Sequence, residues 1–309
     1  MPARLPCVPG MRVASRVQAR LFGVLGDPVD HSLSPAMQNA AFAATGLPHL
    51  YLRYRVPAAA LEEAFAEARR LGMGGLNLTV PLKEAALPLC DAITPAARRI
   101  GAVNTVVVRG QRLLGDNTDA GGFLRGLASR VRLRGTHAVL IGAGGSARAV
   151  GTALVDAGCA RLTVANRTPE RGETLAGLLS ALGCPDARAV PLGALTNRDV
   201  LADAVLVVNT TSLGLRGGAV DVRAAATPPG CLFVDLVYGA RTPFLAAASR
   251  ARRPTLDGMP MLLHQGALAF EAWTGRRAPV PAMARALGSV VLTQPRTPRS
   301  VRARRPPRP

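Results

Sequence analysis

The sequence predicts an α/β protein built from two units, the second of which contains a doubly wound parallel sheet. Short apolar runs alternate with segments whose apolar residues recur every three or four positions, as strands alternate with helices. A glycine-rich turn at residues 142–145 separates one such run from a helical segment. None of the apolar runs approaches the ~18–20 residues that a membrane-spanning helix needs, so we expect no membrane partner.

The first half of the chain alternates strands and helices. Pro35 suits the first turn of a helix, and Gly72 is typical of the position just after one. Residues 109–112 connect two strand-like runs and predict a hairpin. The predicted strands cover residues 21–26, 51–56, 75–80, 102–108 and 113–115, and the predicted helices cover residues 35–45 and 57–71.

From residue 137 the alternation is more regular and predicts βαβ units with a parallel sheet. The predicted strands cover residues 137–141, 161–165, 204–209 and 231–235, and the predicted helices cover residues 145–157, 169–182, 260–274 and 281–292. The first unit is then residues 21–119, completed by helices within residues 259–292, and the second is residues 120–258. We expect a basic, disordered extension over residues 1–20 and an Arg/Pro-rich disordered tail over residues 293–309.

The formal net charge of +19 raises the possibility of a nucleic-acid-binding protein. Residues 1–20 and 294–309 together hold ten arginines and no acid, so about half of this charge lies in the terminal segments. A nucleic-acid-binding face also needs stacking aromatic side chains, and aromatic residues make up only 4% of the chain. We therefore expect no specific nucleic-acid partner.

Five scattered cysteines predict free thiols in a reducing compartment. They form no C-x-x-C pair and have no nearby histidine that would complete a zinc site, so we expect no metal. Residues 1–20 lack the continuous apolar segment of a signal peptide. The sequence therefore predicts a cytoplasmic protein.

The glycine-rich turn predicts a dinucleotide site. Residues 142–147 read G-A-G-G-S-A and fit G-x-G-x-x-A between a strand and a helix. Gly142 permits the tight turn, Gly144 lets the backbone approach a pyrophosphate, and the helix N-terminus faces the phosphate charge. An ordinary glycine-rich turn is the alternative interpretation.

The end of the following strand indicates which dinucleotide binds. Sites that prefer NAD usually place Asp or Glu there to bind the ribose 2′-hydroxyl. This chain has Asn166, Arg167 and Thr168, with Arg171 one helical turn further on. Two guanidinium groups and a hydroxyl can hold a 2′-phosphate through charge-assisted hydrogen bonds. The sequence therefore predicts NADP(H), and two solvated arginines at a helix start are the alternative.

Four polar clusters interrupt the apolar segments at strand ends or turns, where an α/β protein gathers a site. In an extended segment the hydroxyl groups of Ser32 and Ser34 would face the same side and could bind a carboxylate. Capping of the following helix by Ser34 is the competing interpretation. The clusters cover residues 31–35, 77–84, 101–105 and 115–119.

Lys83 is the only lysine among 38 basic residues. Arginine stays protonated at any working pH, whereas a lysine ammonium can be tuned to exchange a proton. Lys83 is therefore a candidate general acid/base, although composition alone leaves open that one lysine survived by chance.

Together these motifs resemble the shikimate dehydrogenase family over about residues 21–290. The resemblance rests on the joint order of H-S-L-S-P, N-L-T-V-P-L-K, G-A-V-N-T, G-D-N-T-D, G-A-G-G-S-A, N-R-T-P-E-R and the helix around Gln265. It implies reduction of 3-dehydroshikimate to shikimate with NADPH, in the route to chorismate and the aromatic amino acids. It also implies a substrate-binding unit and a Rossmann-type unit with the active site in the cleft between them. We expect a monomer or homodimer.

The resemblance also implies roles for individual residues. Lys83 would be the general acid/base, paired with Asp119. Ser32 and Ser34, with Tyr238, would bind the substrate carboxylate. The residues implied for the ring hydroxyls are Thr79, Asn104, Asp119 and Gln265. Those implied for the cofactor are Gly142, Ala143, Gly144, Gly145, Ser146, Asn166, Arg167, Thr168 and Arg171, with Leu236 and Gly258 near the nicotinamide.

One departure from the family lies beside that last group, where Pro260 stands in place of a glycine. Proline is acceptable at a helix start. The nearest alternative function is an NAD-dependent quinate/shikimate dehydrogenase. Such relatives tend to carry an acid where this chain has Asn166 and Arg167. Another alternative is a family member that has lost activity and only binds ligands, and the presence of Lys83 and Asp119 argues against it.

Overall fold

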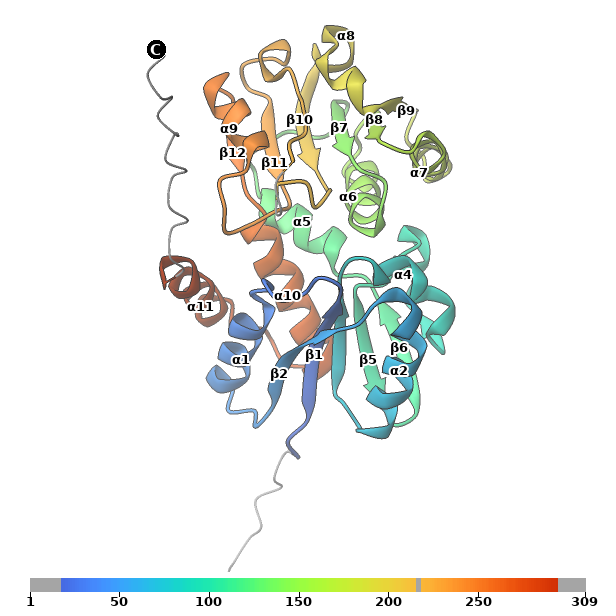
Figure 1. Ribbon diagram of the computed structural model, residues 1–309, viewed down its shortest axis with the longest axis vertical. Coiled ribbons are helices and arrows are strands. Elements are labelled where there is room, and N and C mark those ends of the chain that lie inside the picture. Colours follow the sequence, from blue (N-terminus) through green and yellow to red (C-terminus); the bar gives the residue numbers. More distant parts are fainter. Residues whose placement is uncertain (1–17, 215–217, 294–309) are drawn as a thin grey trace, which may run out of the picture.

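The computed structural model describes residues 18–214 and 218–293. Nearly all of the expected basic extension and of the Arg/Pro-rich tail lies outside the described residues. Within the described residues the strands form two six-stranded sheets. Figure 1 shows these sheets in two lobes, with helices α5 (Asp119–Leu127) and α10 (Met259–Thr274) between them.

The first sheet is mixed, with strand order β2-β1-β3-β5-β6-β4. Its first three strands run parallel, and β5 and β6 form an antiparallel hairpin in which Arg109 pairs with Arg112, as predicted. The strands are β1 (Leu21–Gly26), β2 (Leu50–Arg55), β3 (Gly75–Leu78), β4 (Ala92–Ile93), β5 (Thr105–Arg109) and β6 (Arg112–Asp116). The helices between them are α1 (Ser34–Ala44), α2 (Leu61–Arg70), α3 (Leu82–Ala85) and α4 (Pro95–Ile100).

The second sheet is parallel throughout, with strand order β12-β11-β10-β7-β8-β9. The order reverses at β7, and the crevice beyond the carboxyl ends of strands at such a switch point is where these folds bind ligands. The strands are β7 (His137–Ile141), β8 (Arg161–Asn166), β9 (Asp186–Pro191), β10 (Ala204–Asn209), β11 (Leu232–Asp235) and β12 (Thr255–Leu256). The helices are α6 (Gly145–Asp156), α7 (Pro169–Ala181), α8 (Arg198–Leu201) and α9 (Pro243–Arg250).

The doubly wound parallel sheet predicted from the sequence is therefore confirmed. Every predicted strand and helix is present, and most ends agree within two residues. The strand predicted to reach Val80 ends at Leu78, and the one predicted to begin at Ala102 begins at Thr105. The sequence analysis did not identify α5, although this nine-residue helix joins the two sheets. Gly121, Gly122 and Gly126 within it lower its helix propensity and hide the pattern.

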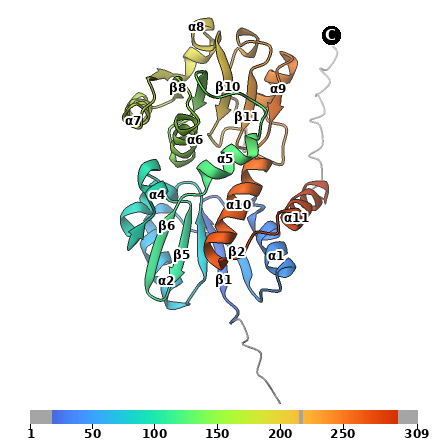
Figure 2. The same cartoon turned by 180° about the vertical axis from the view of Figure 1, so that it is seen from behind.

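The C-terminal helices α10 and α11 (Val280–Thr293) return to the first lobe (Figure 2). Phe270 of α10 and Met283 of α11 are fully buried in one cluster with Phe22 and Phe42. The rings of Phe42 and Phe270 lie 5.7 Å apart. Because α10 also packs against α5, it connects the core of the first lobe to the helix that leads into the second lobe.

The packing of α5 on α10 depends on glycines spaced four residues apart. A Cβ added at Gly122 would lie 2.5 Å from Gln265 Cβ and 2.6 Å from its backbone nitrogen. A Cβ at Gly126 would lie 2.9 Å from the backbone nitrogen of Met261. Glycine on this face of α5 therefore permits backbone contact between the two helices.

Gly122→Ala is expected to lower the free energy of unfolding by about 1–3 kcal/mol, because the added methyl group has no space and must push α10 away. Thermal or urea unfolding measures the change. Gly177→Ala in α7 is the matched control, since its Cβ would meet nothing within 4 Å. That change is expected to stabilise the protein by about 0.5–1 kcal/mol. Equal effects of the two substitutions would contradict the packing argument.

A buried histidine lies at the amino end of β7. His137 is 3% exposed, with Nδ1 2.8 Å from Asp203 Oδ1 and Nε2 2.9 Å from Thr163 Oγ1. Burial lowers the pKa of His137 below its ordinary value of 6.5, against the opposing effect of its hydrogen bond to Asp203. The unfolded chain therefore takes up a proton at a higher pH than the folded chain.

The free energy of unfolding is accordingly expected to fall as pH drops below about 6.5 towards the lowered pKa of His137, by at most about 1.4 kcal/mol per pH unit from this group. Above that pH the contribution is constant. Urea unfolding at pH 7.5, 6.5 and 5.5 measures the slope, and His137→Gln should flatten it. An unchanged slope in the variant would show that other groups cause the acid sensitivity.

Among the described residues, no helix combines the length and apolar character needed to cross a membrane. The described cysteines, Cys90, Cys159, Cys184 and Cys231, are free thiols, and Cys7 lies outside the described residues.

Candidate active site

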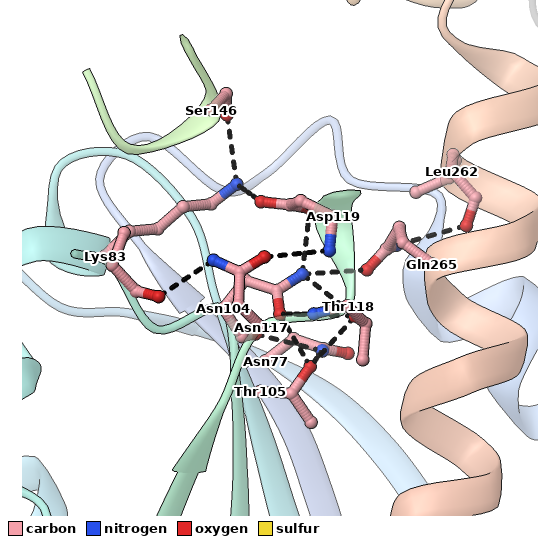
Figure 3. A network of polar contacts seen from close by, with 11 residues as sticks. Asn77, Lys83, Asn104, Thr105, Asn117, Thr118, Asp119, Ser146, Leu262 and Gln265 are labelled. Carbon is pink, nitrogen blue, oxygen red and sulfur yellow. Dashed lines mark hydrogen bonds and ion pairs between the residues drawn. The ribbon is translucent and has the colours of Figure 1, made fainter. Parts of the chain in front are cut away.

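A cavity of about 160 Å³ lies between the two lobes, at the carboxyl ends of β1 and β3 and beside α5, α6 and α10. Polar side chains from both lobes meet in it (Figure 3). It brings together eleven of the residues predicted for the site: Ser32, Ser34, Thr79, Lys83, Asn104, Asp119, Ser146, Leu236, Tyr238, Gly258 and Gln265.

Lys83 and Asp119 both line this cavity and contact each other. Lys83 Nζ lies 2.6 Å from Asp119 Oδ2 and donates to Ser146 Oγ at 3.0 Å. The side chains of Lys83 and Asp119 are 12% and 5% exposed, so the pair is largely buried but water can still reach it. The predicted pairing of Lys83 with Asp119 is thus present as a contact, and it extends to the glycine-rich turn of the second lobe.

Local backbone contacts fix where Lys83 can lie. It follows β3 in the short helix α3, and its carbonyl oxygen accepts from the Val103 amide at 2.8 Å. A Cβ added at Gly145 would lie 2.8 Å from Lys83 Cβ, so the two lobes touch here at a distance that only glycine allows. Asp119 begins α5, and its amide donates to Asn117 Oδ1 at 3.0 Å.

Asn104 binds the second oxygen of the Asp119 carboxylate, Oδ1. Its Nδ2 donates to Asp119 Oδ1 at 2.8 Å and lies 3.4 Å from Gln265 Oε1. Its Oδ1 accepts from the Thr118 amide at 2.8 Å. Asn104 therefore orients the carboxylate that contacts Lys83, while Gln265 on α10 faces the same cavity.

The sequence analysis missed a layer of polar residues behind Asn104. Asn77 Nδ2 donates to the Asn104 carbonyl and to Thr105 Oγ1, both at 3.1 Å. Asn77 Oδ1 accepts from the Tyr51 hydroxyl at 2.7 Å. Asn77 and Thr105 belong to clusters that the sequence analysis had noted, so their polarity at strand ends was a usable signal. Tyr51 gave none, because an aromatic residue in a strand is ordinary.

Ser32, Ser34 and Tyr238 line one wall, but not in the expected conformation. Leu33 has helical φ and ψ of −88° and −3°, so the segment is not extended as predicted. Ser32 Oγ accepts from the Ser34 amide at 3.3 Å. The helix cap is Leu33 and no side chain caps it, which excludes the alternative that Ser34 caps α1. Both serines therefore line the cavity as predicted, but a tight turn places them there and not an extended segment.

Two tyrosines next to this wall stay protonated. Burial raises the pKa of Tyr238, against hydrogen bonds to the Leu33 backbone and Ser32. Burial also raises the pKa of Tyr51 well above its ordinary value, with Tyr238 adding to the shift. A protonated Tyr238 beside two serine hydroxyls gives a cluster of uncharged hydrogen-bond donors, which can bind a carboxylate.

Backbone contacts after β11 form another part of the cavity lining, which includes Leu236 and Gly258. Gly258 lies directly against Leu236, because a Cβ added there would collide with the Leu236 carbonyl oxygen. Gly258 caps α10, and Pro260 lies in the first turn of that helix. The expectation that Pro260 is accommodated at a helix start is confirmed.

The predicted nucleotide turn joins β7 to α6 at the switch point of the second sheet. Gly142 has φ of +108°, a conformation that favours glycine, and its amide donates to the Ala165 carbonyl oxygen at 2.9 Å. Gly144 caps α6 without a side-chain hydrogen bond, so the amides of the first helical turn remain available for an anion. Ala143, Gly144 and Gly145 follow in the same turn. This geometry fits a dinucleotide pyrophosphate.

The residues predicted for the 2′-phosphate lie at the end of the neighbouring strand β8. Asn166 is its last residue, Arg167 and Thr168 connect it to α7, and Arg171 lies in the first turn of that helix. Arg167, Thr168 and Arg171 are all exposed. The strand itself ends in Asn166 where an NAD-preferring site usually has Asp or Glu, which is compatible with a 2′-phosphate. Asn166 Nδ2 donates to the Thr168 carbonyl at 2.8 Å. Arg171 Nη2 donates to Glu84 Oε1 of the first lobe at 3.1 Å, a partner that the sequence analysis did not foresee.

Within residues 18–214 and 218–293, no group of three His, Cys, Asp or Glu side chains is arranged to hold a metal ion.

Comparison with known proteins gives family matches over both lobes. Residues 24–106 match the model for a shikimate dehydrogenase substrate binding domain. Residues 127–237 match shikimate/quinate 5-dehydrogenase, and residues 258–287 match a shikimate 5′-dehydrogenase C-terminal domain.

The chain is also similar to individual members of this family. It is 45% identical over 290 residues to a shikimate dehydrogenase (NADP(+)) of Symbiobacterium thermophilum, covering 92% of this chain and 99% of the relative. It is 48% identical over 276 residues to one of Moorella thermoacetica, covering 86% and 92%.

Solved structures agree with these matches. Shikimate 5-dehydrogenase of Thermus thermophilus in complex with NADP(H) and shikimate is 43% identical, with a TM-score of 0.76, and covers 87% of this chain and 99% of its own. A quinate dehydrogenase of Corynebacterium glutamicum in complex with NAD is 34% identical, with a TM-score of 0.78, and covers 88% and 99%. The fold alone does not distinguish the two activities. The motifs, the matched domains and the identities over nine-tenths of the sequence agree, and the chain belongs to the shikimate dehydrogenase family.

Proposed function

We propose that this protein is an NADP(H)-dependent shikimate dehydrogenase, which reversibly reduces 3-dehydroshikimate to shikimate in the synthesis of chorismate and the aromatic amino acids. The observation that carries the proposal is the position of Lys83. Its Nζ lies 2.6 Å from Asp119 in the first lobe and 3.0 Å from Ser146 in the nucleotide turn of the second. A proton donor therefore lies where a substrate in the cavity would meet a dinucleotide.

We expect the substrate to lie with its carboxylate against Ser32, Ser34 and Tyr238. Its ring hydroxyls would then face Thr79, Asn104, Asp119 and Gln265, which also line the cavity. A set of neutral donors and a set of amide, hydroxyl and carboxylate groups in one cavity match a small polyhydroxy acid.

NADPH, when bound, supplies the hydride that forms the new C–H bond at the ketone carbon. The Lys83 ammonium donates a proton to the carbonyl oxygen, so that an O–H bond forms as an N–H bond breaks, and the amine regains its proton from water. Asp119 holds the ammonium in place through the 2.6 Å contact between Lys83 Nζ and Asp119 Oδ2. In the reverse direction the neutral amine of Lys83 accepts the hydroxyl proton.

Arg167 and Arg171 support NADP(H) over NAD(H). Guanidinium groups at the end of β8 attract a 2′-phosphate, and Asn166 stands where an NAD-preferring site usually has an acid. These residues argue against the NAD-dependent quinate/shikimate dehydrogenase. Arg167, Thr168 and Arg171 would hold the 2′-phosphate, while the turn from Gly142 to Ser146 would hold the pyrophosphate.

Reduction of NADP⁺ and NAD⁺, with shikimate and with quinate, tests the proposal through absorbance at 340 nm. We expect the highest kcat/KM with shikimate and NADP⁺. The absence of turnover with that pair would contradict the main proposal, and a preference for quinate with NAD⁺ would establish the alternative.

The same proposal includes the boundaries of the two units, the cellular compartment and the oligomeric state. We place the substrate-binding unit at residues 21–119 and 259–292 and the nucleotide-binding unit at residues 120–258. The protein would act in the cytoplasm as a monomer or homodimer on small-molecule ligands.

A further inference from the structure

Glu84, the residue after Lys83, reaches across the cleft to two arginines of the second lobe. Its Oε2 lies 3.3 Å from Arg148 Nε on α6, and its Oε1 lies 3.1 Å from Arg171 Nη2 on α7. A Cβ added at Gly144 would lie 4.0 Å from Glu84 Oε1. The carboxylate therefore lies beside the turn expected to hold phosphate groups and is paired with a side chain expected to bind one.

We propose that Glu84 competes with the 2′-phosphate of the cofactor for Arg171, and thereby sets both the affinity for NADP(H) and the selectivity over NAD(H). This inference rests on the proposed function, because that function assigns Arg171 to the 2′-phosphate. Glu84 is then a positioning residue that acts through Arg171.

The two ion pairs of Glu84 differ in how easily they break. The Arg171 side chain is 56% exposed, and exposed ion pairs contribute little to stability, so a phosphate can replace the carboxylate at low cost. The Arg148 side chain is only 19% exposed. Its Nε is buried, and among the described residues Arg148 forms an ion pair with Glu84 alone. The pair with Arg148 therefore keeps Glu84 in place when Arg171 turns to the cofactor.

This arrangement has different consequences for the two cofactors. NADP⁺ must take Arg171 from Glu84, so part of its binding free energy is spent on breaking that pair. NAD⁺ carries a hydroxyl at the same position and leaves the pair intact. Removing the Glu84 charge is therefore expected to strengthen NADP⁺ binding more than NAD⁺ binding.

The test measures the Kd of NADP⁺ and NAD⁺ by isothermal titration calorimetry for the full chain, Glu84→Gln, Arg171→Gln and the double variant. Glu84→Gln is expected to lower the Kd of NADP⁺ by about two- to fivefold, the range of an exposed ion pair, with a smaller change for NAD⁺. In the Arg171→Gln background the same substitution should leave the ratio of the two Kd values unchanged. Glu67→Gln, which removes an equal charge from an exposed pair with Arg70 on α2, is the matched control.

Other outcomes would overturn the proposal. Equal tightening of NADP⁺ and NAD⁺ would show a general charge effect, and weaker NADP⁺ binding would show that Glu84 supports Arg171 in its bound orientation. Wild-type protein that fails to bind NADP⁺ would instead contradict the proposed function.

If Glu84→Gln does not fold, Glu84→Asp serves as the test variant, because the shorter side chain keeps the negative charge and moves it away from Arg171. It is expected to shift the same ratio in the same direction, and an unchanged ratio would overturn the proposal.

Discussion

Lys83→Arg is expected to lower kcat for shikimate oxidation by about 10²–10⁴-fold, the range that general acid/base catalysis contributes. Arginine keeps the positive charge beside Asp119, where Lys83 Nζ lies 2.6 Å from the carboxylate. It cannot release a proton at working pH. The substitution therefore separates proton transfer from electrostatic attraction, which a change to alanine would remove together.

Steady-state kinetics at 340 nm measures kcat, and calorimetry measures the Kd of NADP⁺, which should change little. Arg70→Lys on α2 is a matched exchange at an exposed ion pair and should leave both values unaffected. A Lys83→Arg enzyme with near wild-type kcat would show that Lys83 contributes charge alone. A large loss of NADP⁺ affinity would instead indicate that the longer side chain displaces Ser146, which Lys83 Nζ contacts at 3.0 Å.

The parts of the fold that the sequence predicted are those with strong local patterns. Strands β7 and β10 each contain an uninterrupted apolar run, and the turn at Gly142 is defined by glycine spacing. The nine-residue helix α5 was missed for the opposite reason. Its glycines serve close packing on α10, as the 2.5 Å approach at Gly122 shows, and this tertiary requirement suppresses the local helix signal.

The residues of the site also fall into those that the sequence could predict and those that it could not. Lys83, Asn104 and Asp119 could be predicted because they lie in polar motifs at strand ends, and the fold brings them within hydrogen-bond distance. Glu84 could not, because a glutamate in a short helix is ordinary until the second lobe is placed against it. Its contacts with Arg148 and Arg171 join residues 64 and 87 positions apart, which no local pattern reports.

The double substitution Arg167→Gln, Arg171→Gln is expected to raise the Kd and KM of NADP⁺ by about 10- to 100-fold. A charge-assisted hydrogen bond contributes about 1.5–3 kcal/mol when formed, and the exposure of both arginines lowers the expected loss to about 0.7–1.4 kcal/mol for each. The Kd of NAD⁺ should change by less than about twofold, because NAD⁺ has no phosphate for either guanidinium. The enzyme should therefore lose its preference for NADP⁺ while kcat with saturating cofactor is retained.

Calorimetry with both cofactors measures the selectivity, and kcat at saturating NADP⁺ tests whether Lys83 and Asp119 remain in place. Arg130→Gln, Arg198→Gln removes the same two charges from exposed positions that precede the amino ends of β7 and β10, at the opposite edge of the sheet. If this control weakens NADP⁺ binding equally, long-range attraction by the net positive charge is responsible. If only the pair at the end of β8 matters, the preference is set locally by the residues that follow Asn166, where an acid would favour NAD⁺.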